Sequence, residues 1–272
     1  MMNGTVNGAF SLVANNTGTT NFDGTVGGTT ALTSLSTNAG GTTAINGGSV
    51  TTSGNQTYND NVTMNQATTL TSTGGTIMFG GNATNNAVGA GITVDAPTIN
   101  LTGGITIATT GNGLINFFAD TLNPNGASIN TGTGAFSLSP NVLTRTIEFG
   151  DVNTGRVTDV YYRTNFGSVT AGSFTIGRPT HTGNIFVTSV AAAPSAINIV
   201  NGGTGSVTFE NAPYVSGNQN LGVLRGSGGI SLGSNLTVGT GTLRLTTTAA
   251  ITQTAGTITA NTAVYPPSRA LA

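Results

Sequence analysis

The chain has 272 residues, of which only 6% are charged and 42 are glycine, and its formal net charge is −1. All seven basic residues are arginines, and there are too few of them for the basic patch that nucleic acids or an anionic membrane surface require. Cysteine is absent, which excludes disulfides and thiolate metal sites. A folded surface with so little charge must be covered mainly by threonine, asparagine and serine.

The first ten residues, MMNGTVNGAF, have neither a positively charged segment nor an apolar run, so they do not form a signal peptide. No apolar run is long enough to cross a membrane as a helix. The repeat-like sequence pattern that continues downstream is already present at the first residues of the chain. We therefore expect it to be a piece of a longer protein.

A pattern occurs twice near the start. Residues 11–24 read SLVANNTGTTNFDG and residues 34–47 read SLSTNAGGTTAING, so like residues recur 23 positions apart. Such a period is typical of a solenoid, in which each coil lays like residues on those of the coil before. The stacked pairs that we expect are Leu12/Leu35 and Phe22/Ile45 inside, and Gly18/Gly41 and Gly24/Gly47 at the corners.

Apolar residues recur at every second position along most of the chain, as in Ile92/Val94, Phe136/Leu138 and Leu243/Leu245. This alternation is the pattern of a strand with one buried face. Asn-Gly and Gly-Gly steps between these pairs mark tight turns. No stretch free of glycine and proline has a helical period. Together with the repeat, the alternation predicts an all-β chain folded as a parallel β-helix (β-solenoid) of roughly 20–23 residues per coil, with irregular insertions.

We expect one continuous solenoid over residues 1–264. It comprises a regular ladder at 1–144, a charged irregular insertion at 145–190 and a second ladder at 191–264. The tail, 265–272, contains two consecutive prolines and cannot continue a ladder, because proline lacks the backbone donor.

The repeat drifts after about residue 55. The stretch Gly75–Gly81 echoes Gly41–Gly47 at a spacing of 34. We therefore expect coils of variable length in this part of the chain, with loops that leave the solenoid.

Half of the sixteen charged or histidine residues lie within residues 145–181, with two tyrosines among them. This cluster is the most charged part of the chain, and we expect it to be the recognition segment. Its candidate ligand-binding residues are Arg145, Glu148, Asp151, Arg156, Asp159, Tyr161, Tyr162 and Arg163.

Two other interpretations of this cluster stay open. β-Helix lyases and hydrolases act on polysaccharides with two or three carboxylates and a cation, a role that Glu148, Asp151 and Asp159 could fill with Arg156. In the simpler interpretation the charges pair with one another in a solvated loop. Alternation along the strand then places Glu148 outside, on the face opposite Ile147.

No other motif indicates catalysis or a metal. His181 is the only histidine, and we expect it to be an exposed turn residue, since one histidine cannot form a multi-histidine metal site. Calcium loops, phosphate loops and a nucleophile elbow are all absent. We expect no catalytic residue, no metal site and no cofactor. Thr-x-Thr pairs such as Thr69/Thr71 and Thr252/Thr254 raise one alternative, a flat threonine array that binds ice.

Several segments resemble a known family. Residues 42–47 (TTAING), 54–63 (GNQTYNDNVT), 172–178 (GSFTIGR) and 249–260 (AAITQTAGTITA) are similar to the repeats of filamentous-haemagglutinin-like and autotransporter-like bacterial surface adhesins. The resemblance covers about residues 4–264. It implies a right-handed parallel β-helix, type V export through an outer-membrane translocator, and a role in attachment or biofilm. That family has no catalytic residues that could be assigned to positions in this chain.

We therefore expect a structural or display segment of a secreted adhesin at the bacterial cell surface, not an enzyme. Its expected partners are glycans, host or matrix proteins, or sister adhesin chains, and not nucleic acid. Two alternatives remain: a polysaccharide-processing β-helix enzyme that uses the charges at 145–163, and an ice-binding threonine-array solenoid.

Overall fold

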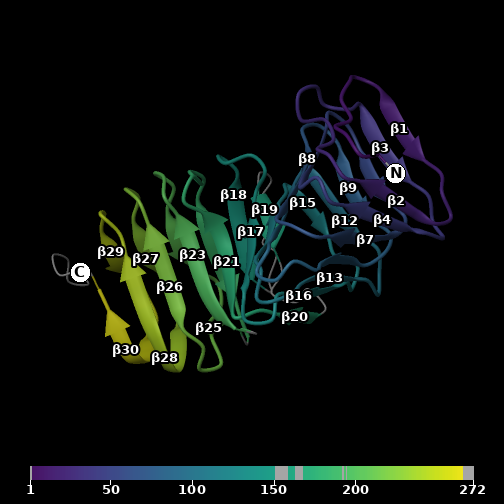
Figure 1. Ribbon diagram of the computed structural model, residues 1–272. Coiled ribbons are helices and arrows are strands. Elements are labelled where there is room, and N and C mark those ends of the chain that lie inside the picture. Colours follow the sequence, from purple (N-terminus) through teal and green to yellow (C-terminus); the bar gives the residue numbers. More distant parts are fainter. Residues whose placement is uncertain (1, 151–158, 163–167, 192, 194, 266–272) are drawn as a thin grey trace. The chain divides into compact units, whose positions relative to one another are not determined.

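The computed structural model describes residues 2–150, 159–162, 168–191, 193 and 195–265, with the backbone alone for 159–162. Every regular element among these residues is a β-strand, and the strand pairings are parallel (Figure 1). The fold is a right-handed parallel β-helix, as predicted. The chain forms two compact units, Met1–Phe136 with Phe166–Ala171 and Ser137–Asn165 with Gly172–Ala272.

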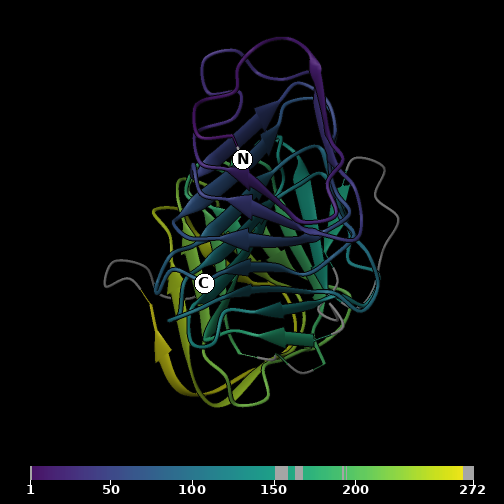
Figure 2. The same ribbon diagram turned by 45° about the vertical axis from the view of Figure 1, so that its right-hand side comes forward.

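The first unit builds three parallel sheets from short strands that recur in turn along the chain (Figures 1 and 2). The first sheet contains β1 (Ser11–Ala14), β3 (Ser34–Thr37), β6 (Gln56–Tyr58), β9 (Thr76–Phe79), β12 (Thr98–Leu101) and β15 (Thr121–Asn123). The second contains β2 (Thr19–Phe22), β4 (Thr42–Ile45), β7 (Asn61–Met64), β10 (Ala83–Asn85), β13 (Thr106–Thr109), β16 (Ser128–Asn130) and β20 (Ser168–Thr170). The third contains β5 (Ser49–Thr52), β8 (Thr68–Ser72), β11 (Ile92–Asp95) and β14 (Ile115–Phe118).

The repeat seen in the sequence is the register of the first two coils. Leu12 pairs with Leu35, and Phe22 pairs with Ile45. Phe22 and Ile45 have no exposed surface, because alternate side chains of each strand point into the solenoid. The corner glycines stack as expected. A Cβ atom on Gly47 would lie 2.1 Å from the carbonyl oxygen of Gly24.

Coil length varies in the first unit, as expected, although over a narrow range and not only after residue 55. Up to β16 the paired positions stay 19 to 24 residues apart, from Thr42 with Asn61 to Thr68 with Ile92. The echo at spacing 34 is no stacking relation, since Thr76–Phe79 lies in the sheet of β3 and Thr42–Ile45 in the sheet of β2. The same Gly-Thr-apolar pattern occurs in strands of different sheets, so sequence similarity between two segments does not show that they are stacked.

Asparagine side chains join successive coils of both units at the turns. The side-chain oxygen of Asn61 accepts the backbone N–H of Asn82 at 2.9 Å, and Asn82 in turn accepts that of Thr106 at 2.8 Å. The same bond, to an N–H 21 to 24 positions later in the chain, is made by Asn7, Asn55, Asn112, Asn184, Asn218, Asn220 and Asn235. Backbone donors that the short strands leave unpaired at the turns are satisfied in this way.

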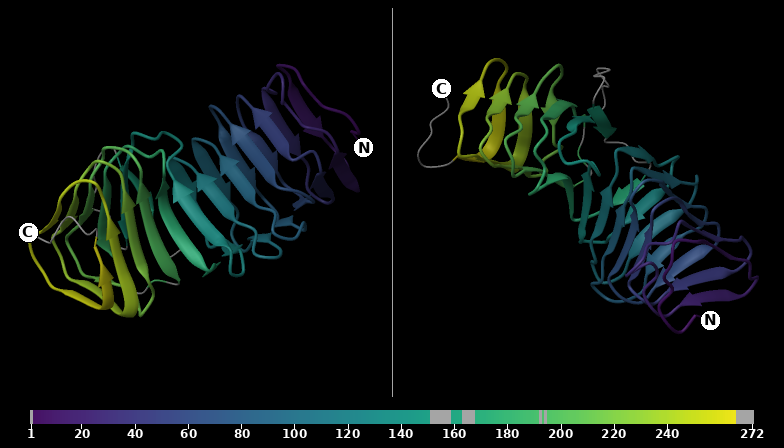
Figure 3. Two further views of the ribbon diagram at one scale, coloured as in Figure 1. Left: turned by 60° about the vertical axis from the view of Figure 1, so that its left-hand side comes forward. Right: turned by 90° about the horizontal axis from the view of Figure 1, so that it is seen from above.

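The second unit continues the same coil pattern (Figure 3, green to yellow). One sheet contains β21 (Ser173–Arg178), β23 (Ala196–Asn201), β26 (Leu221–Arg225) and β28 (Leu236–Thr246), with β25 (Tyr214–Val215) and β30 (Ile258–Val264) paired to β28. The other contains β19 (Asp159–Tyr162), β18 (Thr146–Gly150), β22 (Ile185–Ser189), β24 (Val207–Phe209), β27 (Ile230–Leu232) and β29 (Ile251–Gln253). Strand β17 (Ala135–Ser139) contains the boundary between the units.

The ladder spacing of the second unit changes around β18. This strand pairs with β22 through Ile147 and Ile185, 38 positions apart, whereas β22 pairs with β24 through Ile185 and Val207, 22 positions apart. On its other side β18 pairs with β19, with Thr146 next to Asp159, only 13 positions later. The charged segment therefore contributes strands to the ladder rather than a single protruding loop.

Candidate ligand-binding groove

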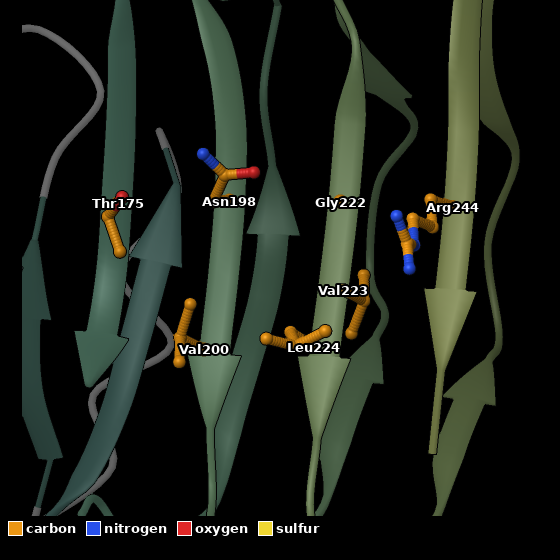
Figure 4. A pocket seen from close by; sticks show the side chains of 7 residues that line it. All are labelled: Thr175, Asn198, Val200, Gly222, Val223, Leu224 and Arg244. Atoms are coloured by element: carbon orange, nitrogen blue, oxygen red, sulfur yellow. The ribbon is translucent and has the colours of Figure 1, made fainter. Parts of the chain in front are cut away.

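A groove lies on the outward face of four consecutive strands of the second unit, β21, β23, β26 and β28 (Figure 4). The register sets Thr175 beside Asn198, Asn198 beside Gly222, and Gly222 beside Arg244. The residues that flank these four positions on each strand point inward and are at most 1% exposed. The four positions therefore form a polar row across the outer face.

A second row runs beside the first, two residues further along each strand. Val200 pairs with Leu224, and Leu224 pairs with Thr246. Leu224 is 50% exposed and gives this row an apolar surface. The groove thus has one polar row and one mainly apolar row.

Gly222 creates the depression. It has no side chain, and an added Cβ atom would lie 2.9 Å from the side-chain oxygen of Asn198. Asn198 and Arg244 belong to strands separated by the glycine strand, so their backbones are about 10 Å apart. Figure 4 shows the Arg244 guanidinium and the Asn198 oxygen both turned toward Gly222. The volume of the groove is about 460 Å³, which is within the range of small-molecule sites.

Arg244 supplies the charge of the groove. Neither of its neighbours in the ladder, Gly222 and Val264, is acidic. Within the part of the chain that the structure describes, the side chains of Arg244 and Asn198 form no hydrogen bond or ion pair. An exposed guanidinium and an amide that face one gap are therefore free to bind a group with oxygen acceptors.

No family model, curated protein or solved structure matches this chain.

The residues predicted for ligand binding are only partly described. Arg145 is exposed in the turn before β18. Asp151, Arg156 and Arg163 lie outside the described residues. The other predicted positions, Asp159, Tyr161 and Tyr162, are in β19, where the backbone alone is described. The predicted role of this cluster, and the catalytic convergence of carboxylates that was its alternative, stay predictions.

The expected exposure of Glu148 is wrong. The residue lies in β18, with Phe186 of β22 on one side in register and Tyr161 of β19 on the other, and it has no exposed surface. A solvated loop would leave its carboxylate in water. Alternation still places Glu148 opposite the inward Ile147 and Phe149, but this outward position is covered.

The expected exposure of His181 is also wrong, since this side chain has no exposed surface. Its turn is covered by the corresponding turn of the next coil, where the N–H of Gly203 donates to the His181 carbonyl oxygen at 2.9 Å. Burial, with the positive charge of Arg178 adding to it, lowers the pKa of His181 to about 4. The histidine is therefore neutral at physiological pH and is part of the interior.

The threonine pairs do not form one array. Thr69 and Thr71 of β8 have Thr93 and Asp95 as their neighbours on β11, and next to these come Asn116 and Phe118 of β14. The pair at 252 and 254 belongs to the sheet of β29, whereas that at 257 and 259 belongs to the region of β30 in the other sheet. The flat Thr-x-Thr face required for ice binding is not present among the described residues.

Two further features are absent from the described residues. Within them, no group of three or more histidine, cysteine or acidic side chains could hold a metal ion. The described part of the chain also has no helix that could span a membrane.

The residues of the groove were not singled out from the sequence, although two signals exist there. Gly222 interrupts the alternating strand LGVLR, and a glycine inside a strand often marks a place of close approach. Arg244 stands between two inward leucines, which places the guanidinium on the outer face. Neither signal shows that the two positions are neighbours.

Proposed function

We propose that this chain is a display segment of a bacterial surface adhesin, exported through an outer-membrane translocator, which mediates attachment or biofilm contacts through the outer face of its solenoid. The observation that carries the proposal is the outward groove on β21–β28. It presents an unpaired cation, an amide and an exposed leucine on a rigid ladder of paired strands. Binding residues held on a rigid scaffold lose little conformational entropy when a ligand binds.

The chemistry of the rest of the surface supports a display role. A net charge of −1 and a charged fraction of 6% minimise unspecific electrostatic attraction, so contacts depend on local shape and hydrogen bonds. Each coil of a β-helix is stabilised by the coil next to it, so the fold can grow coil by coil as a chain emerges from a membrane. The absence of cysteine makes such folding independent of disulfide formation.

The proposal is tested by coupling the purified chain to beads and measuring their retention on surfaces coated with glycans, matrix proteins or the chain itself. We expect retention on at least one glycan or matrix-protein surface, and a reduction when soluble chain competes. Circular dichroism must show that the coupled protein is folded. If beads are retained no better than beads carrying a denatured sample on every surface, the attachment function is wrong.

Deleting residues 145–181 is not a suitable test of the charged segment. The deletion would remove β18 and β21, each of which is paired with a strand on either side in the ladder. Loss of binding would then report loss of the fold. The substitution Arg145→Gln is a milder probe, because Arg145 is exposed in a turn.

A further inference from the structure

We propose that the outward groove binds a carboxylated sugar, with Arg244 holding the carboxylate and with Asn198, Leu224 and the gap at Gly222 holding the ring. This inference rests on the proposed attachment function, since it names the ligand class of the same surface. Three features of the groove lead to it: the free guanidinium, the groove volume, and the use of a sheet face rather than a sheet edge.

The free guanidinium favours a carboxylate. Its planar fork of N–H donors matches the two oxygens of a carboxylate, and this charge-assisted pair is among the strongest hydrogen-bonded contacts in proteins. Arg244 is exposed and has no ion pair among the described residues, so no internal pair must be broken before a ligand binds. Tetrahedral sulfate or phosphate groups are usually held by several donors or cations, and this groove has one arginine.

The groove at Gly222 has a volume that can admit a sugar ring. Asn198 and Arg244 reach it from strands on either side whose backbones are about 10 Å apart, so a ring above the glycine can contact both side chains. The Asn198 amide can both donate and accept, which suits a ring hydroxyl. The exposed face of Leu224 lies two residues further along the glycine strand, where the C–H face of a ring can cover it.

A peptide ligand is disfavoured by the place of the groove in the sheet. Extended peptides usually bind by adding a strand to a free sheet edge, where main-chain groups are unpaired. Strand β26, which carries Gly222, is paired with β23 on one side and with β28 on the other. Its main-chain groups are therefore occupied, and a ligand must be recognised through the outward side chains alone.

The test measures binding of the whole chain to uronic-acid oligosaccharides, to their methyl esters, to sulfated and neutral oligosaccharides, and to an acidic peptide, by calorimetry or on an array. We expect the uronic acids to bind more tightly than their methyl esters by about tenfold or more, since the ester removes the charged acceptor. Arg244→Gln should weaken uronic-acid binding by a similar factor and remove the preference over the ester. Arg244→Lys should restore part of the affinity.

Two further variants separate the groove from general effects. Gly222→Val fills the gap with a residue favourable in strands, and its Cβ atom would meet only the mobile end of Asn198. It should weaken both the acid and the ester. The control Thr208→Ala removes an outward polar side chain from β24, in the other sheet of the same unit, and it should leave binding unchanged. All variants are compared with the parent chain by circular dichroism and thermal unfolding.

The outcomes distinguish the proposed sugar-binding groove from the proposed attachment function. Binding of uronic acids that is unaffected by Arg244→Gln, or that is lost on Thr208→Ala instead, overturns the groove but leaves the attachment function in place. A stronger response to the sulfated sugar or to the acidic peptide, with the same dependence on Arg244, overturns the carboxylated sugar as ligand. If no probe binds and the beads are retained nowhere, both proposals are wrong.

Discussion

Asparagine at a coil corner is the residue that links local and long-range structure in this protein. Its side chain is short enough for the amide oxygen to reach a backbone N–H of the next coil, as between Asn61 and Asn82. Asparagine also tolerates the left-handed conformation that tight corners need, and the four described non-glycine residues with positive φ are all asparagines: Asn112, Asn125, Asn211 and Asn218. One residue type thus both turns the chain and joins two coils.

The role of the amide oxygen can be tested at Asn61. Asn61→Ala removes the acceptor of the Asn82 N–H, and we expect a loss of about 1 kcal/mol in the free energy of unfolding. Asn61→Asp keeps an acceptor at the same place and should lose less than half as much. Urea unfolding monitored by circular dichroism measures both. Equal losses for the two variants would show that the bond does not stabilise the coil.

Buried His181 predicts a dependence of stability on pH. Its pKa in the folded chain is about 4, below the ordinary value of 6.5, because burial and the charge of Arg178 disfavour the imidazolium. Folding therefore favours the neutral form. The stabilisation is complete above pH 6.5 and is lost as the pH falls toward 4, by up to about 3 kcal/mol.

The measurement compares the parent chain with His181→Gln, whose side chain does not titrate. Unfolding free energies at about pH 7.5 and about pH 4.5 should differ by about 2–3 kcal/mol more in the parent chain than in the variant. The acidic side chains titrate in both proteins, so their contribution cancels in the comparison. Parallel pH curves for the two proteins would be incompatible with a buried neutral histidine.

At the scale of the element, the coil is held in register by direct backbone contact at its glycine corners. Gly18 and Gly41 stack like Gly24 and Gly47, with no room for a side chain between the two turns. The strands between the corners are only three to five residues long in most of the first unit, as in β2 (Thr19–Phe22) and β6 (Gln56–Tyr58). Such short strands have few ladder bonds, so corner contacts matter for the alignment of one coil on the next.

The substitution Gly47→Ala tests this contact. The new Cβ atom would lie 2.1 Å from the Gly24 carbonyl oxygen, and since backbone atoms cannot move aside without shifting the coil, we expect a loss of about 3 kcal/mol. Gly4→Ala is the matched control, because its Cβ atom would meet nothing within 4 Å. It should change stability by less than about 0.5 kcal/mol. Thermal and urea unfolding of both variants decide the matter, and an unchanged Gly47→Ala protein would contradict the tight stacking.

At the scale of the whole chain, a composition with few charges favours stability from inward apolar ladders and uncharged hydrogen bonds. The two units repeat one arrangement: apolar residues such as Ile107 and Leu243 are completely buried, and the outward neighbours are mostly threonine, serine or asparagine. With a charged fraction of 6%, long-range electrostatics contribute little to the folded state.

Because the chain has few charges, we predict that its thermal stability hardly depends on ionic strength. Between about 0.02 M and about 0.2 M sodium chloride, at neutral pH, we expect the midpoint of thermal unfolding to shift by less than about 2 °C. Differential scanning calorimetry at several salt concentrations measures it. A shift of more than about 5 °C would mean that ion pairs stabilise the chain more than its composition indicates.

The sequence predicted correctly which residues of the first two coils are stacked on one another. The pairs Leu12/Leu35 and Phe22/Ile45 were predicted because apolar positions must stack inside a solenoid, and they are ladder partners. Prediction failed for Glu148 and His181, whose burial depends on strands and turns from elsewhere in the chain. Alternation and turn propensity are local, and they cannot report what covers a residue.

The sequence by itself determined the coil: its period, its alternating strands and its corner residues, because each of these follows from the chemistry of about twenty neighbouring residues. Only the tertiary structure decided which outward residues meet. Asn198 and Arg244 are 46 positions apart in the sequence and lie on either side of Gly222 because two successive coils advance by 24 and then 22 residues. A slip of one residue in either coil would move Arg244 out of line with Gly222, since outward positions alternate with inward ones. In a chain of such similar Thr, Gly and Asn repeats, that register is set by the packing of the whole ladder.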